Sequence, residues 1–89
     1  MIPKNLADLA PTSEDVTPYD REHFPLYLEL IDAIDEGALI DELCTDVLHI
    51  DPQADRERAV TCLESHILRA RWLEEKDDFK RFMTEYLFN

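Results

Sequence analysis

Glu64-Ser65-His66 is the first set of residues in this 89-residue sequence whose types could do chemistry, because it places a nucleophile beside a base. On a helix, consecutive side chains point in different directions. We therefore expect these three side chains to diverge and to form no nucleophile–base pair. Gly37 is the only glycine, which excludes a glycine-rich phosphate loop. The sequence predicts that this protein is not an enzyme.

A second set comprises Cys44, His49, Cys62 and His66, which have the donor types of a zinc site with two cysteines and two histidines. Cys62 and His66 are spaced to share one face of a helix. A Cys-x4-His spacing is unusual for zinc, however, and no Cys-x2-Cys pair is present. Reduced cysteines in a core and histidines on helix surfaces account for the same residues. We expect neither a metal nor another cofactor.

The charge of the chain is strongly negative and unevenly distributed. There are 21 acidic and 9 basic side chains, which give a net charge of −12. Residues 14–51 form an acidic block in which Arg21 is the only cation, whereas acidic and basic residues nearly balance over 52–89. Phosphate backbones repel such a chain unless its few cations gather on one face. Composition therefore favours a protein partner over nucleic acid.

Apolar residues recur at helical spacing and predict a small all-α domain. Gly37 supplies a helix stop and Pro52 breaks the next helix. Three prolines among residues 1–18 prevent a long helix there, so we expect a flexible N-terminal arm followed by one domain over 19–89. The four predicted helices cover residues 24–36, 38–48, 56–73 and 75–87.

Each predicted helix has one apolar stripe that is expected to face the core. The stripes are Tyr27, Leu30, Ile31 and Ile34; Leu39, Leu43 and Val47; Val60, Leu63, Ile67 and Ala70; and Phe79, Phe82, Met83, Tyr86 and Leu87. No apolar run approaches the roughly 20 residues of a membrane span, and residues 1–4 lack the apolar centre of a signal peptide. We expect a cytoplasmic monomer.

Three runs of sequence resemble a bacterial domain-of-unknown-function family. They are PLYLELIDAIDEG at 25–37, IDEL at 40–43 and SHILRARWL at 65–73. Members of that family are helix-turn-helix variants in regulators of integrative and conjugative elements. The resemblance implies a helix-turn-helix-like core, in which 38–48 supports a recognition helix at 56–73. It also implies an antiactivator, which binds a transcriptional activator or quorum-sensing regulator and represses transfer of the element.

The chain departs from DNA-binding members of that family in its charge. Its expected recognition helix carries Glu57 and Glu64 among four arginines and follows the acidic block. That departure favours a protein-binding surface of opposed charges, with Trp72 as an apolar anchor. The candidate partner-binding residues are Asp32, Asp35, Glu36, Asp41, Glu42, Asp46, Arg56, Arg58, Arg69, Arg71 and Trp72.

Other interpretations of these residues stay open at this point. The arginines could pair with the acidic block, Trp72 could fill the edge of the core, and the acidic face, which also includes Glu29, could serve solubility alone. The charge also fits an acidic DNA mimic that inhibits a nuclease or restriction enzyme, although the cations of the second half interrupt a phosphate-like row. A third alternative is a DNA-binding domain that uses Arg56, Arg58, Arg69 and Arg71.

Overall fold

The computed structural model describes residues 6–88, with side chains described through Glu85. Every regular element in this range is helical, which confirms the all-α fold class. The elements are α1 (Pro18–Glu22), α2 (Phe24–Asp35), α3 (Ile40–Glu42), the π-helical turn η1 (Leu43–Val47), α4 (Arg56–Leu73) and α5 (Asp77–Phe88). The prediction of four helices was incomplete, because α1 was missed and the second helix is partly π-helical.

The missed helix α1 begins with a capping box. The Thr17 hydroxyl accepts a hydrogen bond from the Asp20 amide, and Asp20 Oδ2 accepts one from the Thr17 amide at 2.8 Å. Pro18 occupies the first turn, where its missing N–H removes no intrahelical bond. A proline that indicates a loop by composition therefore starts a helix.

The end of α2 follows the glycine stop that the sequence predicts. Gly37 has φ +87°, a conformation that residues with a Cβ rarely adopt. Its amide donates to the Ile34 carbonyl and the Ala38 amide donates to the Ala33 carbonyl, each at 3.0 Å. This pair of bonds is a Schellman motif, which satisfies carbonyls at the helix end.

The helix predicted over 38–48 begins later and changes type. It starts at Ile40, and the Glu42 carboxylate accepts the Leu39 amide hydrogen bond at 2.8 Å. From Leu43 the backbone widens into a π-helical turn, and the Leu48 amide donates to the Leu43 carbonyl. His49 then adopts φ +58°, which lets the chain turn away from the helix.

Helix α4 forms as predicted, with Asp55 as its N-cap. The Asp55 carboxylate accepts a hydrogen bond from the Arg58 amide. The connection that precedes α4 covers residues 48–55, which is longer than the roughly three- to four-residue turn of a helix-turn-helix motif. The helices follow one another in the order expected for a helix-turn-helix core, but this longer connection leaves such a core unconfirmed.

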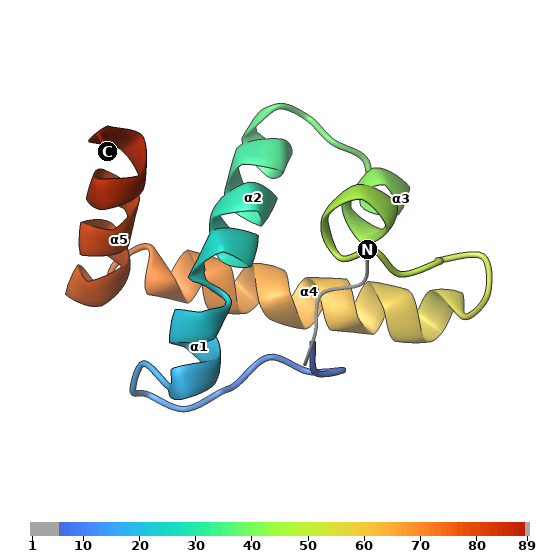
Figure 1. Cartoon of the computed structure of the whole chain (residues 1–89). Coiled ribbons are helices and arrows are strands. Elements are labelled where there is room, and N and C mark those ends of the chain that lie inside the picture. Colours follow the sequence, from blue (N-terminus) through green and yellow to red (C-terminus); the bar gives the residue numbers. More distant parts are fainter. Residues whose placement is uncertain (1–5, 89) are drawn as a thin grey trace.

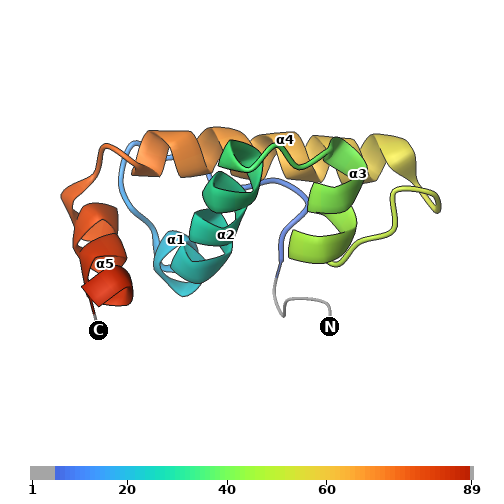
Figure 2. The same ribbon diagram turned by 90° about the horizontal axis from the view of Figure 1, so that it is seen from above.

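Helix α4 is the longest helix, and α2 and α3 lie on one side of it in Figures 1 and 2. Helix α5 lies beyond the C-terminal end of α4, next to α2. Helix α2 packs on α4 and η1, while α5 packs on α2. The edge-to-face contact of Phe24 with Phe79, at 5.1 Å between ring centroids, joins α5 to α2.

The core is built from the stripes that the periodicity predicts. Tyr27, Leu30, Ile31, Leu43, Val47, Leu63, Ala70 and Phe79 are buried, and Ile34, Ile67, Phe82 and Met83 pack partly buried against them. Leu39 is the main exception, because it precedes α3 and is 69% exposed. The side chains of Tyr86 and Leu87 lie outside the described residues.

The described part of the N-terminal arm, residues 6–17, is fastened to the domain. Ala10 is buried and its amide donates to the Ser65 hydroxyl at 3.0 Å, while the Ala7 amide donates to the Tyr19 hydroxyl. The Arg69 guanidinium donates to two arm carbonyls. These contacts place the segment beside α4, whereas the sequence predicts a flexible arm; residues 1–5 lie outside the described residues.

Candidate protein-binding surface

The predicted acidic residues lie on two neighbouring elements. Asp32, Asp35 and Glu36 come from the second half of α2 and its end, and Asp41, Glu42 and Asp46 come from α3 and η1. All six are exposed, as is Glu29. The Schellman turn at Gly37 reverses the chain between the two elements, and the carboxylates of both elements are exposed to solvent. We call these six residues, together with Glu29, the acidic corner.

Three of these carboxylates line one depression at that corner. The depression has a volume of about 450 Å³ and is lined by Ala33, Glu36, Gly37, Ala38, Glu42, Leu43, Asp46 and Val47. We call it the acidic hollow. No lysine or arginine lines it, so its walls carry three negative charges without a counter-charge. Leu39 and Ile40 lie in the sequence between the two groups of lining residues, and their side chains are 69% and 49% exposed. The segment that forms the acidic hollow therefore also carries two exposed aliphatic side chains.

Three of the predicted arginines are exposed and paired with carboxylates. Arg56 binds Asp41 at 2.8 Å, Arg58 binds Asp8 at 2.9 Å, and Arg71 binds Glu74 at 2.7 Å. A longer contact of 3.7 Å joins Arg71 to Asp35. Exposed pairs of this kind each contribute about 0–1 kcal/mol to stability. They remove Asp35 and Asp41 from the unpaired acidic surface but leave the acidic hollow unchanged.

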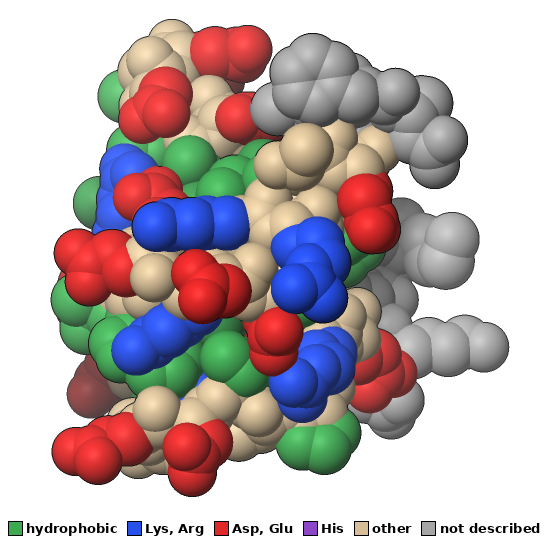
Figure 3. All heavy atoms as spheres, turned by 90° about the vertical axis from the view of Figure 1, so that its left-hand side faces the viewer, with side chains coloured by type: hydrophobic (Ala, Val, Ile, Leu, Met, Phe, Trp, Pro, Cys, Tyr) green, Lys and Arg blue, Asp and Glu red, His purple; other side chains and the backbone are tan. Residues whose placement is uncertain are grey.

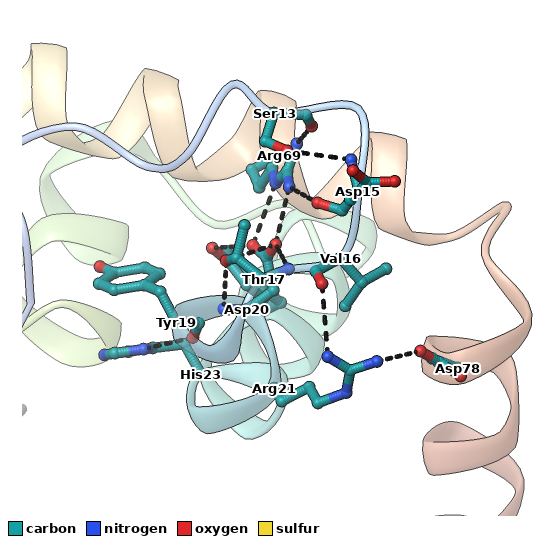
Figure 4. Close-up of polar contacts among 11 residues, drawn as sticks. Ser13, Asp15, Val16, Thr17, Tyr19, Asp20, Arg21, His23, Arg69 and Asp78 are labelled. Atoms are coloured by element: carbon teal, nitrogen blue, oxygen red, sulfur yellow. Dashed lines mark hydrogen bonds and ion pairs between the residues drawn. The ribbon is translucent and has the colours of Figure 1, made fainter.

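Arg69 is the correction to the predicted site, because it belongs to the interior. Its side chain is 4% exposed, and its Nε and Nη2 atoms donate to the two carboxylate oxygens of Asp20 at 3.0 and 2.7 Å. Its Nη1 and Nη2 atoms also donate to the carbonyls of Ser13 and Asp15 (Figure 4). A guanidinium engaged in this way holds the arm and α1 on α4 and is not available to a partner.

Trp72 lies at the edge of the core and carries two cations. The Arg69 guanidinium lies 3.9 Å and the Lys76 ammonium 4.3 Å from the centre of its rings. Contacts of this type stabilise by about 0.5–1 kcal/mol at exposed sites. Trp72 is half-buried and also lines a small depression against residues 10–14 of the arm. Its position is compatible with the core-edge interpretation, and the residue is still partly exposed.

Asp20 is the important residue that sequence reasoning missed. It is fully buried, and besides Arg69 it accepts hydrogen bonds from the Thr17 amide and hydroxyl and from the Tyr27 hydroxyl. Burial acts to raise the pKa of this carboxyl, but the bonds from Arg69 and Thr17 outweigh burial and hold the pKa below its usual value. The spacing Thr17-x-x-Asp20 was the available signal, since it is that of a capping box.

His66 is also buried, where the sequence analysis expects a histidine on the helix surface. Its Nδ1 donates to the Cys62 carbonyl at 2.7 Å, so Nε2 accepts the hydrogen bond from the Tyr19 hydroxyl, also at 2.7 Å. Ser65 Oγ lies 3.3 Å from Nδ1, so these side chains do not diverge as predicted. Because Nδ1 already carries its proton, it cannot act as a base toward Ser65.

The burial of His66 predicts a pH dependence of stability. Burial holds the pKa of His66 below its usual value, so as the pH falls below about 6.5 the unfolded chain binds a proton that the folded chain resists. We expect the free energy of unfolding to decrease as pH falls through this range, and the His66→Gln variant to lack that part of the decrease. Urea unfolding at pH 7.5, 6.5 and 5.5 measures it. His49→Gln is the matched control, and equal pH slopes for the two variants would contradict the assignment.

The potential zinc donors are not gathered in one place. Cys62 Sγ lies 3.8 Å from His66 Nδ1, but Cys44 Sγ contacts the Ala59 carbonyl instead. Within residues 6–85, no three histidine, cysteine or carboxylate side chains are placed to hold a metal ion. Burial raises the pKa of both cysteine thiols. Both thiols are therefore packing groups in this arrangement.

No protein-family model matches the chain, and no curated protein matches it significantly. None of the helices described over residues 6–88 combines the length and apolar character needed to cross a bilayer.

Proposed function

We propose that this protein is an antiactivator, which binds a transcriptional activator or quorum-sensing regulator and represses transfer of an integrative and conjugative element. In this proposal it acts in the cytoplasm as a monomer with a helix-turn-helix-like core and has no catalytic role. Two arguments support it: the sequence resemblance to regulators of such elements, and the form of the acidic corner between α2 and η1.

The acidic hollow is the observation that carries the proposal. Glu36, Glu42 and Asp46 line a depression without a cation, and the exposed Leu39 and Ile40 adjoin it in sequence. A DNA-binding regulator presents lysine and arginine side chains on the surface that contacts phosphates. Such a cation would find, in the acidic hollow, three carboxylates without an ion-pair partner among the described residues, and apolar parts of the same surface would bury the side chains of Leu39 and Ile40. Occupying that surface would keep the regulator from DNA.

The charge distribution does not favour the two nucleic-acid alternatives. All four arginines of the DNA-binding alternative have a carboxylate partner, and Arg69 is buried. The face formed by α5 and the end of α4 shows lysines and arginines interspersed with carboxylates (Figure 3). Interspersed charges of both signs do not resemble the continuous row of a phosphate backbone, which argues against a DNA mimic that uses this face.

The proposal is tested with the purified chain and the purified activator encoded beside it. Titration calorimetry at about 50 mM salt should show a saturable complex, and adding the chain should remove the activator from its promoter DNA in a gel-shift assay. Transcription from that promoter should fall in the same proportion as DNA binding. Absence of a complex at this salt concentration, where charge attraction is strong, would overturn the proposal.

A further inference from the structure

Another cavity, which shares no lining residue with the acidic hollow, lies among three segments of the chain. It has a volume of about 510 Å³ and is walled by residues 6–8 of the arm, residues 49–55 of the connection and the first half of α4. This volume is within the range of about 300–1,000 Å³ that is typical of small-molecule sites. Its apolar lining residues are Leu6, Ala7, Ile50, Ala54, Ala59 and Cys62.

The charged residues of this cavity leave a negative excess. Arg58 and Asp8 neutralise each other, because Nε and Nη2 of Arg58 both donate to Asp8 Oδ1. Asp51 and Asp55 each accept a single backbone hydrogen bond through Oδ1, from Gln53 and Arg58. Within the described residues neither carboxylate forms an ion pair, although the charge of Asp55 helps to raise the pKa of the Arg58 guanidinium. The cavity therefore combines an apolar lining with two carboxylates that lack an ion-pair partner.

We propose that this cavity binds a small organic amine, in which a protonated amino group is joined to an apolar body such as an aromatic ring or a short alkyl chain. The amino group meets Asp51 and Asp55 at the rim, and the apolar body lies against Ile50, Ala54 and Ala59. An anionic ligand of the same shape is repelled, and a neutral one gains only the apolar contact. This site is separate from the acidic hollow and does not depend on the antiactivator function.

The test compares three probes of one shape: 2-phenylethylamine, 2-phenylethanol and 3-phenylpropanoate. We expect the amine to shift the amide NMR signals of Ile50, Ala54 and Ala59 saturably, with an affinity about tenfold or more above that of the alcohol, because the ion pair forms at the edge of an apolar site. The carboxylate should produce no saturable shift. Equal affinities for amine and alcohol, or shifts centred on another part of the chain, would overturn the proposal.

Two variants and a control make the charge argument specific. Asparagine is as good a cap as aspartate, so Asp51→Asn with Asp55→Asn keeps both backbone hydrogen bonds while removing both charges. This double variant should bind the amine and the alcohol equally. Ala54→Trp, at an exposed position, should fill the mouth and abolish both interactions. Asp46→Asn, in the acidic hollow, should leave amine binding unchanged. Retention of full amine affinity by the double variant would contradict the inference.

Discussion

Asp20→Ala is expected to lower the free energy of unfolding by about 3–5 kcal/mol, because it leaves the buried Arg69 guanidinium without its counter-charge. The pair is bidentate, and its two side chains are 0% and 4% exposed. A domain of this size is typically stable by only about 5–15 kcal/mol, so the loss is a large fraction of the total stability. Circular dichroism during urea and thermal unfolding measures the loss.

The matched control for this prediction is the exposed contact of Arg71 with Asp35. Asp35→Ala should cost less than about 1 kcal/mol, because both partners remain hydrated. The double variant Asp20→Leu/Arg69→Met should recover part of the stability, since an apolar pair leaves no buried charge. It should not restore the arm, whose carbonyls at Ser13 and Asp15 lose their donor. If Asp20→Ala lowers the free energy of unfolding no more than Asp35→Ala does, the buried ion pair of Asp20 with Arg69 does not stabilise the fold as predicted.

The same carboxylate predicts a dependence on acid. The pKa of Asp20 is held below its usual value, so the stabilisation that its charge provides is complete above about pH 4 and is lost as the pH falls through the lowered pKa. Asp20→Asn removes this titration. The difference in unfolding free energy between the wild-type chain and that variant should therefore shrink below pH 4, and a difference that stays constant to pH 2 would contradict the assignment.

Local signals account for the parts of the fold that the sequence predicts correctly. Helices α2 and α4 have a strong apolar period, and Gly37 is the residue type that a left-handed helix stop requires. Helix α1 was missed because three nearby prolines argue against a helix, although Pro18 follows a capping residue. The π-helical turn was missed because adjacent pairs, Leu43-Cys44 and Val47-Leu48, present a buried face in an α-helix and in a π-turn alike.

The candidate site was predicted unevenly for a different physical reason. An acidic residue on the polar side of a helical pattern is exposed in almost any arrangement, so the acidic corner follows from periodicity alone. The location of an arginine depends on whether a distant part of the chain supplies a buried carboxylate. Arg69 finds Asp20, which is 49 residues away in sequence. No local pattern shows that pairing, and the local sequence does not distinguish the buried Arg69 from the exposed Arg71.

Reversing the charge of the acidic hollow is the functional change with the largest expected effect. The triple variant Glu36→Lys/Glu42→Lys/Asp46→Lys should weaken binding to the activator by about 100-fold or more, because a cationic surface would meet three like charges. All three residues are exposed, but Glu42 also caps α3 by accepting the Leu39 amide hydrogen bond, so circular dichroism has to show that the variant keeps its helical content. Wild-type association should slow as salt rises from about 10 to 150 mM, since the Debye length falls from about 30 to 8 Å.

The control for this variant makes the same change of charge elsewhere. Glu64→Lys/Glu75→Lys/Glu85→Lys alters exposed positions on α4, on α5 and between them, so it has the same net charge as the first triple variant. It should slow association modestly through the overall field and leave the dissociation rate unchanged, whereas the hollow variant should raise the dissociation rate as well. Equal losses in both variants would mean that net charge alone attracts the partner. Unchanged binding in both would place the interface on another face, and the antiactivator would then have to act through a surface other than the acidic corner.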